Sequence, residues 1–173
     1  HYGGCPCRIK ELREIAEDRG LLLLEDAAEA LGARVGSKKV GSFGDSSILS
    51  FCQNKIITTG EGGAMVTDSR DLYEKMKLIR SHGRLETADY FTSYKSMDYV
   101  SLGYNFRLSN LLAALGSAQI KKVDTIIAMR KRIADTYVNS LLGKTSEIVT
   151  LKKPNNYNHV YQLFSIRVQE RDQ

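Results

Sequence analysis

Apolar side chains in the first part of the chain follow two spacings, and each spacing predicts a different element. Between residues 9 and 16 they return every three or four positions and Gly20 follows, which predicts a helix. The block Leu21–Leu24 is apolar without alternation, which is typical of a parallel strand covered on both faces. Further strands are predicted over Ile48–Cys52 and Ala64–Thr67, with a small hairpin over residues 33–40.

The second part of the chain is more helical. A helix is predicted after the capping residues Asp68 and Ser69, and another after Ser109. A third helix is predicted over residues 123–142 and ends at Gly143. Residues 81–103 lack periodicity and predict a long loop, and apolar positions between Val160 and Val168 predict a strand that begins a new unit. The alternation of strands and helices favours an α/β fold class.

Composition narrows the classes of function. The 173 residues include 25 Lys and Arg against 20 Asp and Glu, a formal net charge of +5, and the charge is not gathered into a basic arm typical of nucleic-acid binding. No apolar run reaches the ~20 residues of a membrane span. Three cysteines cannot all pair within one chain, which favours a reducing compartment. We expect a cytoplasmic protein without a nucleic-acid or membrane partner.

Candidate chemistry lies where the predicted strands end. Asp26 follows the leucine block and Lys55 follows the Ile48–Cys52 strand, and ligands of parallel sheets bind outside the carboxyl ends of strands. By spacing alone, however, a surface Asp and a surface Lys at loop starts is the better interpretation. The run Gly60–Gly63 lacks the spacing of a phosphate-binding loop, so a tight turn is favoured over an anion site.

No metal site is predicted. Cys5 and Cys7 have no second ligand pair at metal-type spacing. His1, His82 and His159 show no spacing typical of a triad, so structural hydrogen-bonding roles are favoured for all three.

Taken together, the segments resemble the DegT/DnrJ/EryC1/StrS sugar aminotransferase family. The matching motifs are HYGGCPC at residues 1–7, EDAA at 25–28, GSFGD at 41–45, SFCQNK at 50–55 with TTGEGG at 58–63, RSHG at 80–83 and GYNFR at 103–107. The block from residue 50 to residue 63 is the most specific of them. The resemblance extends from His1 to about Val168, with the motifs in the order that the family has.

The resemblance implies pyridoxal 5′-phosphate (PLP) as cofactor and assigns roles to five residues. Lys55 would form the Schiff base with PLP and then move the proton between the substrate and the cofactor. Asp26 would accept the hydrogen bond of the pyridine N–H. Ser50 would donate to the phosphate, and Asn105 would reach the phosphate held by a neighbouring subunit, so a homodimer is expected. Glu29 stands beside the cofactor ring where the family usually has Gln or His, and a carboxylate at this position would either disturb the hydrogen bond to the phenolic oxygen of the ring or be protonated.

The resemblance also implies an architecture. Residues 1–107 would be part of the three-layer α/β/α large domain of a fold-type I PLP-dependent transferase. Residues 108–145 would form connecting helices, and residues 146–173 would begin a small C-terminal domain. Because the family has further segments on both sides of the matched region, and because residue 1 is His, we expect the chain to be a central fragment that by itself can be inactive.

The expected activity of the parent protein is amination of a nucleotide-linked keto-sugar with glutamate as amino donor. Two alternatives stay open. A PLP-dependent sugar dehydratase on the same scaffold would have His in place of Lys55, which argues against it. A regulatory protein that only keeps the fold is disfavoured by the intact Asp26, Ser50 and Lys55.

Overall fold

A computed structural model describes residues 1–85, 98–141 and 148–168. The helices are α1 (Ile9–Asp18), α2 (Arg70–Arg80), α3 (Asn110–Ile120) and α4 (Val123–Leu141), preceded by a 3₁₀ turn, η1 (Tyr2–Gly4). The strands are β1 (Leu24–Asp26), β2 (Arg34–Val35), β3 (Lys38–Lys39), β4 (Ser46–Ser50), β5 (Gly63–Val66), β6 (Ile148–Thr150), β7 (Tyr157–Asn158) and β8 (Ile166–Val168).

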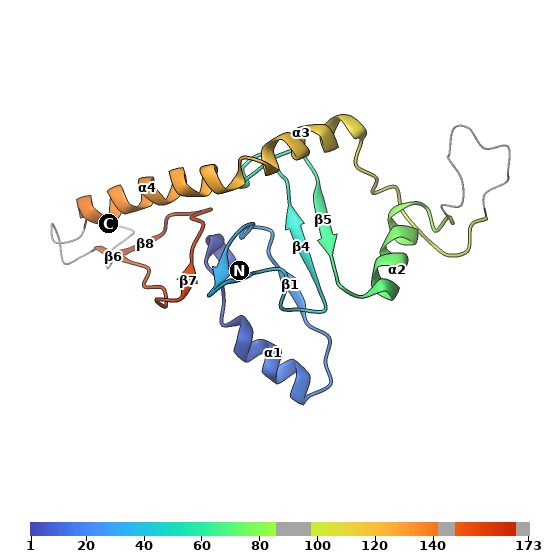
Figure 1. Cartoon of the computed structure of the whole chain (residues 1–173), viewed down its shortest axis with the longest axis horizontal. Coiled ribbons are helices and arrows are strands. Elements are labelled where there is room, and N and C mark those ends of the chain that lie inside the picture. The colour runs from blue at the N-terminus through green and yellow to red at the C-terminus, as the bar shows by residue number, and fades with distance from the viewer. Residues whose placement is uncertain (86–97, 142–147, 169–173) are drawn as a thin grey trace.

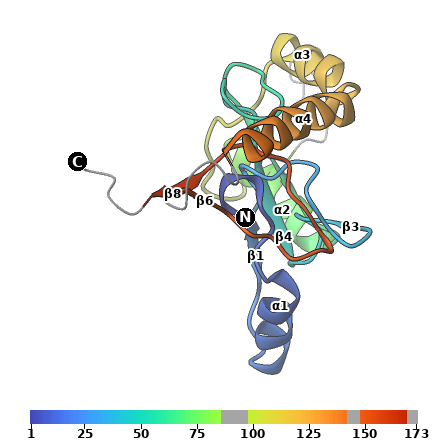
Figure 2. The same ribbon diagram turned by 90° about the vertical axis from the view of Figure 1, so that its left-hand side faces the viewer.

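The central sheet has the strand order β1-β4-β5. β1 pairs with β4 in parallel and β5 pairs with β4 antiparallel. The helices α3 and α4 run past the carboxyl end of β4, and α1 lies at the opposite end of the sheet (Figure 1). The loop between β4 and β5 therefore ends up beside α3, as the side view also shows (Figure 2).

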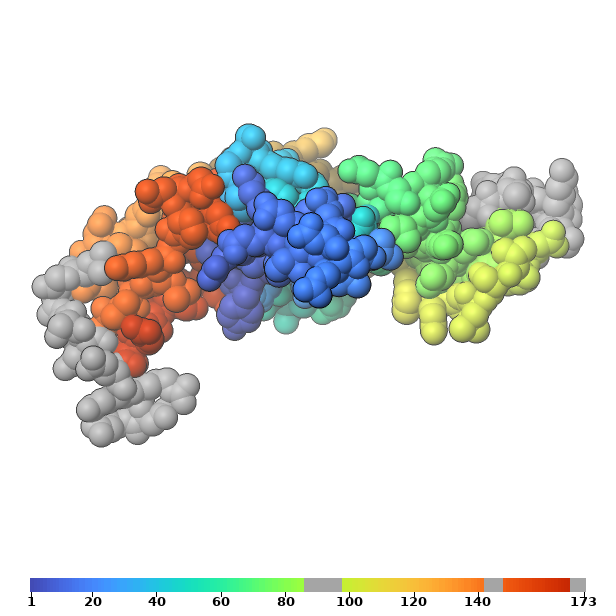
Figure 3. Space-filling model, turned by 90° about the horizontal axis from the view of Figure 1, so that it is seen from below, coloured from blue at the N-terminus to red at the C-terminus, as the bar shows by residue number. Residues whose placement is uncertain are grey.

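A second, antiparallel sheet joins distant parts of the chain. Its order is β3-β2-β7, so the predicted hairpin is present and gains a third strand from near the C-terminal end. Just beyond β7, the N–H of Val160 donates to the carbonyl of Gly4 (3.1 Å) and that of Leu163 to the carbonyl of Gly3 (3.0 Å). Figure 3 shows the C-terminal segment packed directly beside the N-terminal one.

A close backbone approach makes this docking possible. Gly4 has a φ of +92°, and a Cβ there would lie 2.8 Å from the backbone nitrogen of Gln162. Side chains from both ends of the sequence then share one core. Its buried apolar members are Ile9, Ala27, Ala30, Ala33, Val35, Val40, Ile56, Ile57, Ile127 and Val160.

The predicted strand over Leu21–Leu24 is wrong in extent and in burial. Only Leu24 belongs to β1, and the side chains of Leu21 and Leu22 are 61% and 81% exposed. The paired residues of β1 start at Leu24, opposite Ser46. Leu23, just before it, is held by Asp45, whose N–H donates to the Leu23 carbonyl at 2.8 Å and whose carboxylate accepts the Leu23 N–H at 2.7 Å. The residue of this strand that points into the interior is Glu25, which is 2% exposed.

Two other predicted strands need adjustment. The second strand is Ser46–Ser50 rather than Ile48–Cys52; β5 pairs with it antiparallel, a direction that the sequence did not predict. The single strand expected between Val160 and Val168 is limited to β8, and Val160 is instead fully buried in the core shared with the N-terminal segment. Of the predicted 81–103 loop, residues 86–97 lie outside the described residues, as does Gly143.

The predicted helices are confirmed, with the expected caps. The Ser69 side chain accepts a hydrogen bond from the Leu72 N–H, and the Ser109 side chain accepts one from the Leu112 N–H, each at 3.3 Å. Such caps satisfy N–H groups that have no partner inside the helix. The 19-residue α4 follows α3 after a two-residue break, so the two helices lie end to end along the molecule (Figure 1).

Candidate active site

The carboxyl ends of β1 and β4 lie side by side at one edge of the sheet. Asp26, the last residue of β1, is paired with Ile48, and the Ala27 N–H continues the pairing with a hydrogen bond to the Ile48 carbonyl (3.1 Å). Ser50 is the last residue of β4. Because the strands are parallel and adjacent, both residues stand at the edge where parallel sheets bind ligands.

Lys55 forms an ion pair with Glu29, the residue that departs from the family pattern. Its ammonium Nζ lies 3.2 Å from Oε1 of Glu29, in the loop that follows β1. The Lys55 side chain is 17% exposed and that of Glu29 is 25% exposed. The structure therefore brings together the amine after β4 and a carboxylate three residues beyond Asp26. The pair is partly shielded but still reachable from solvent.

Glu29 is held as an anion. Its other oxygen, Oε2, accepts a hydrogen bond from the Gly3 N–H at 2.7 Å. That hydrogen bond lowers the pKa of Glu29 below its ordinary value, burial opposes the change, and the Lys55 ammonium lowers the pKa further. Of the two states that a carboxylate could take here, the arrangement favours the ionised one.

Asp26 presents its carboxylate outward. The residue is exposed, and Oδ1 accepts one hydrogen bond, from the Ala28 N–H at 3.0 Å. Its carbonyl accepts a hydrogen bond from the backbone nitrogen of His1, also at 3.0 Å. Oδ2 accepts no hydrogen bond from residues 1–85, 98–141 or 148–168. One carboxylate oxygen therefore has room for a donor that is not part of the described chain.

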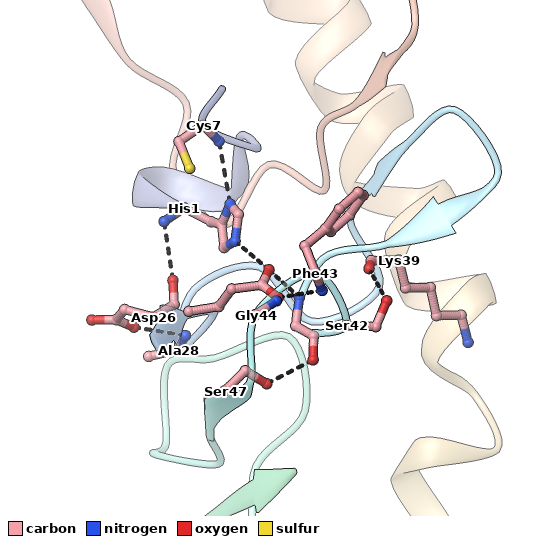
Figure 4. Close-up of polar contacts among 11 residues, drawn as sticks. His1, Cys7, Asp26, Ala28, Lys39, Ser42, Phe43, Gly44 and Ser47 are labelled. Atoms are coloured by element: carbon pink, nitrogen blue, oxygen red, sulfur yellow. Dashed lines mark hydrogen bonds and ion pairs between the residues drawn. The ribbon is translucent and has the colours of Figure 1, made fainter. Parts of the chain in front are cut away.

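The residue before Asp26 has the opposite environment, which the sequence did not predict. Glu25 accepts hydrogen bonds from the backbone N–H groups of Gly41 (2.7 Å), Phe43 (2.5 Å) and Gly44 (2.6 Å) (Figure 4). Both glycines are required by the geometry: Gly41 has a φ of +85°, and a Cβ on Gly44 would lie 2.5 Å from the Leu23 carbonyl. The GSFGD motif is thus a cradle for a buried carboxylate.

His1 completes this cradle, and its hydrogen bonds define its tautomer. Its Nε2 lies 2.9 Å from Oε2 of Glu25, and its Nδ1 accepts the Cys7 N–H at 3.2 Å (Figure 4). Because Nδ1 is the acceptor, the ring proton lies on Nε2 and is donated to the carboxylate. The structural role predicted for His1 is therefore confirmed, and it fixes the strand that ends at Asp26.

The remaining two candidates, Ser50 and Asn105, have hydrogen bonds of their own. The Ser50 hydroxyl accepts the Cys52 N–H at 3.3 Å, a contact that leaves its own proton available for a ligand. Asn105 is exposed, forms a β-bridge with Ser81, and accepts a hydrogen bond from the Arg107 Nε at 3.1 Å. No contact joins Asn105 to the other four candidates within the described residues.

Two further features do not add to the site. In the described ranges, no group of three or more His, Cys, Asp or Glu side chains is arranged to bind a metal ion. An open hollow of about 620 Å³ lies around Arg13, Asp45 and Ser69 and is lined by none of the five candidates. Arg13 in this hollow is ion-paired with Glu17 (2.7 Å) and Asp45 (3.2 Å).

Comparison with known proteins covers the whole chain. The family model of the DegT/DnrJ/EryC1/StrS aminotransferases matches residues 1–173. GDP-perosamine synthase of Vibrio cholerae is 39% identical over 166 residues, which are 96% of this chain and 43% of that protein. UDP-4-amino-4,6-dideoxy-N-acetyl-beta-L-altrosamine transaminase of Helicobacter pylori is 37% identical over 166 residues, 94% of this chain and 42% of that protein.

The fold of the chain is also similar to that of solved aminotransferase structures. The structure of Helicobacter pylori PseC, an aminotransferase involved in the biosynthesis of pseudoaminic acid, superimposes with a TM-score of 0.87 at 34% identity. The match covers 98% of this chain and 44% of that one. The chain thus spans less than half the length of the relatives it matches. Within residues 1–85, 98–141 and 148–168, no helix is both long and apolar enough to cross a bilayer.

Proposed function

The chain belongs to the DegT/DnrJ/EryC1/StrS aminotransferase family, and we propose that it supplies the lysine and the ring-binding carboxylate of a PLP-dependent aminotransferase. The match to PseC confirms the expected fold class, part of a fold-type I α/β transferase. The observation that carries the proposal is the placement of Lys55 next to the edge where β1 and β4 end. The proposed substrate is a nucleotide-linked keto-sugar, with glutamate as amino donor; the GDP- and UDP-sugar names of the two relatives support the substrate class.

The residues at this edge fit PLP in their chemistry. A pyridine N–H needs an acceptor, and Asp26 has a carboxylate oxygen that accepts nothing from the described residues. An aldehyde needs an amine, and Lys55 is a partly shielded one. A phosphate needs donors, and the Ser50 hydroxyl stands at the end of the adjacent parallel strand. When bound, PLP withdraws electrons from the α-carbon of the substrate through its protonated ring.

Asp26 would keep the ring nitrogen protonated. An ionised carboxylate that accepts the pyridine N–H favours the charged form of that nitrogen, as any opposite charge in contact does. The strand that carries Asp26 is fixed from behind by the Glu25 cradle, so the carboxylate is presented from a rigid element.

Lys55 would move the proton at the α-carbon of the substrate. A lysine amine can do so only after it has lost its own proton. Before the cofactor arrives, however, this amine is ion-paired with Glu29. We infer that the ion pair between Lys55 and Glu29 opens when PLP binds to the Lys55 amine.

Ser50 and Asn105 would bind the phosphate from two subunits. Ser50 would donate from its own chain, and the exposed Asn105 would reach the site of a partner in a homodimer. A cytoplasmic location is proposed with these roles, since all three cysteines are free, as is typical of a reducing compartment.

The test is a PLP titration of the full protein, followed by visible absorption. We expect an absorption band that saturates with one PLP per subunit and that is lost in Lys55→Ala. Lys39→Ala, an exposed lysine on β3, is the matched control and should keep the band. Addition of glutamate should then bleach the band. A band that persists in Lys55→Ala would overturn the assignment.

A further inference from the structure

The loop that carries Lys55 is held by its own hydrogen bonds and by side chains from elsewhere. Within the loop, the Lys55 N–H donates to the Cys52 carbonyl at 3.0 Å and the Thr59 N–H donates to the Phe51 carbonyl at 2.9 Å. It runs from the end of β4 to the start of β5, beside α3 (Figure 1, Figure 2). Ile56 and Ile57 are buried and anchor its apolar side. Lys55 itself lies between two residues, Asn54 and Thr58, whose backbone polar groups face other parts of the chain.

Gln119 of α3 holds one side of the loop. Its Nε2 donates to the Thr58 carbonyl at 2.8 Å, and its Oε1 accepts the Thr58 N–H at 3.2 Å. The side-chain amide thus pairs with both backbone groups of a single residue, as a neighbouring strand would. The two residues are 61 positions apart in the sequence.

Gln162 holds the other side. Its Nε2 donates to the Asn54 carbonyl at 2.6 Å across 108 positions of sequence, and the residue is only 7% exposed. Its Oε1 is buried and accepts no hydrogen bond from the described residues. Among these residues, the side-chain amide of Gln162 therefore hydrogen-bonds to Asn54 alone. Arg130 of α4 fixes the backbone at this point by donating to the carbonyl of Gln162 at 3.3 Å.

The segment that carries Gln162 also reaches the partner of Lys55. The Leu163 N–H donates to the Gly3 carbonyl at 3.0 Å, and the Gly3 N–H donates to Glu29 at 2.7 Å. Gln162 therefore contacts the Lys55 loop at Asn54. Leu163 contacts Gly3, and Gly3 in turn donates to the Glu29 carboxylate. The ammonium and its counter-ion are positioned by the same short segment.

We propose that Gln119 and Gln162 are positioning residues that fix the Lys55 amine, a role that rests on the proposed function of Lys55. Neither side chain contacts Lys55 itself. Each acts on the backbone within three residues of it, on opposite sides. A reacting group displaced by ~1 Å can lose about 10²-fold in rate, so a loop that carries the central amine has to be held at both ends.

The experiment measures the reactivity of the Lys55 amine without PLP. Limited amounts of an acetylating reagent are added to the native full protein, and the ratio of labelled Lys55 to labelled Lys10, an exposed lysine on α1, is measured by peptide mass spectrometry. Gln119→Met and Gln162→Met keep the length of the side chain but remove the amide. Gln53→Met is the matched control, because Gln53 is an exposed glutamine in the same loop.

We expect the labelling ratio to rise at least threefold in Gln119→Met and Gln162→Met and to stay unchanged in Gln53→Met. Because Lys10 is already exposed, its labelling corrects for the amount of reagent, and an unchanged urea midpoint of the variant excludes general loosening of the fold. An unchanged ratio in variants with native circular dichroism would overturn the proposal. Should a Met variant not fold, hydrogen exchange of the Thr58 N–H in the unmodified protein replaces it, and exchange as fast as that of exposed loop N–H groups would equally overturn the proposal.

The outcome is separable from that of the proposed function. Attachment of PLP to Lys55, with labelling ratios that the glutamines do not affect, would refute the positioning role alone. Absence of PLP from Lys55 in the unmodified protein would refute the proposed function whatever the labelling shows.

Discussion

Two glutamates four residues apart, Glu25 and Glu29, sit in opposite environments. The Glu25 side chain is 0% exposed and accepts hydrogen bonds from His1 and from three backbone N–H groups, all within 2.9 Å. The Glu29 side chain is 25% exposed and has two partners, the Gly3 N–H and the Lys55 ammonium. The first carboxylate is saturated by a cradle of backbone, and the second shares its charge with a flexible side chain.

The comparison distinguishes a carboxylate that holds the fold in place, Glu25, from one whose ion pair can open, Glu29. Moving Glu25 would leave several buried donors without a partner, which is costly. Releasing Lys55 from Glu29 costs one ion pair that solvent partly screens. Asp26 lies between the two glutamates in the sequence. It follows Glu25 on the strand that Glu25 fixes, and Glu29, whose ion pair can open, comes three residues later. A carboxylate on a rigid strand next to an ion pair that can open supports the role proposed for Lys55.

The largest expected effect is on stability, from Glu25→Gln. The amide keeps the size of the side chain but places an NH₂ group among N–H donors, and we expect a loss of about 3–5 kcal/mol in the free energy of unfolding. Urea unfolding followed by circular dichroism measures it. Glu29→Gln is the matched control and should lose no more than about 1 kcal/mol. Equal losses of unfolding free energy in the two variants would show that Glu25 and Glu29 do not differ in their contribution to stability.

The next effect is on rate, from Asp26→Asn. Without the carboxylate the ring nitrogen would lose its proton, so we expect the half-reaction with glutamate to slow by about 10²–10³-fold while some PLP stays bound. Single-turnover absorption measures the rate. Asp18→Asn, at the exposed end of α1, serves as control. A rate within a few-fold of the unmodified protein would show that Asp26 does not bind the ring.

A smaller effect is expected on cofactor attachment, from Glu29→Gln. Loss of the counter-ion removes an ion pair that has to open before the amine can react, so attachment of PLP at neutral pH should become about fivefold faster, which corresponds to ~1 kcal/mol. Stopped-flow absorption with excess PLP measures it. Slower attachment would instead mean that Glu29 assists the reaction of Lys55.

The smallest effect is the pH dependence of stability that Glu29 contributes. Because the folded-state pKa of Glu29 is lowered, its contribution is present above the unfolded value near 4.5 and is lost as the pH falls through the lowered pKa. The difference in stability between the unmodified protein and Glu29→Gln should be constant at neutral pH and shrink toward zero below pH 4.5. A difference that grows on acidification would contradict the ionised state of Glu29.

Local signals predicted the helices and part of the sheet, and long-range contacts set the rest. Apolar spacing and the caps Ser69 and Ser109 were sufficient for α2 and α3. The leucine block was over-interpreted, because an apolar run does not reveal which residues find a partner strand. Pairing began at Leu24, and a charged residue took the buried position.

The candidate site was predicted only in part for the same reason. The motifs indicated Asp26, Glu29, Ser50, Lys55 and Asn105, but not that Lys55 and Glu29 form an ion pair. The Lys55–Glu29 ion pair spans 26 residues, the His1–Glu25 contact 24 and the Gln162–Asn54 hydrogen bond 108. Such contacts leave no periodic signal, since each depends on a single side chain that the fold brings to a distant backbone group. The roles of the five residues toward PLP stay predictions.

The central claim, that Lys55 is the residue to which PLP attaches, is tested most directly by borohydride trapping. The full protein is loaded with PLP, reduced, digested and mapped by peptide mass spectrometry. We expect the reduced cofactor on the peptide that contains Lys55, at close to one per subunit, in the unmodified protein and in Glu29→Gln alike. Reduced cofactor on another lysine, or none on the Lys55 peptide, would contradict the assignment.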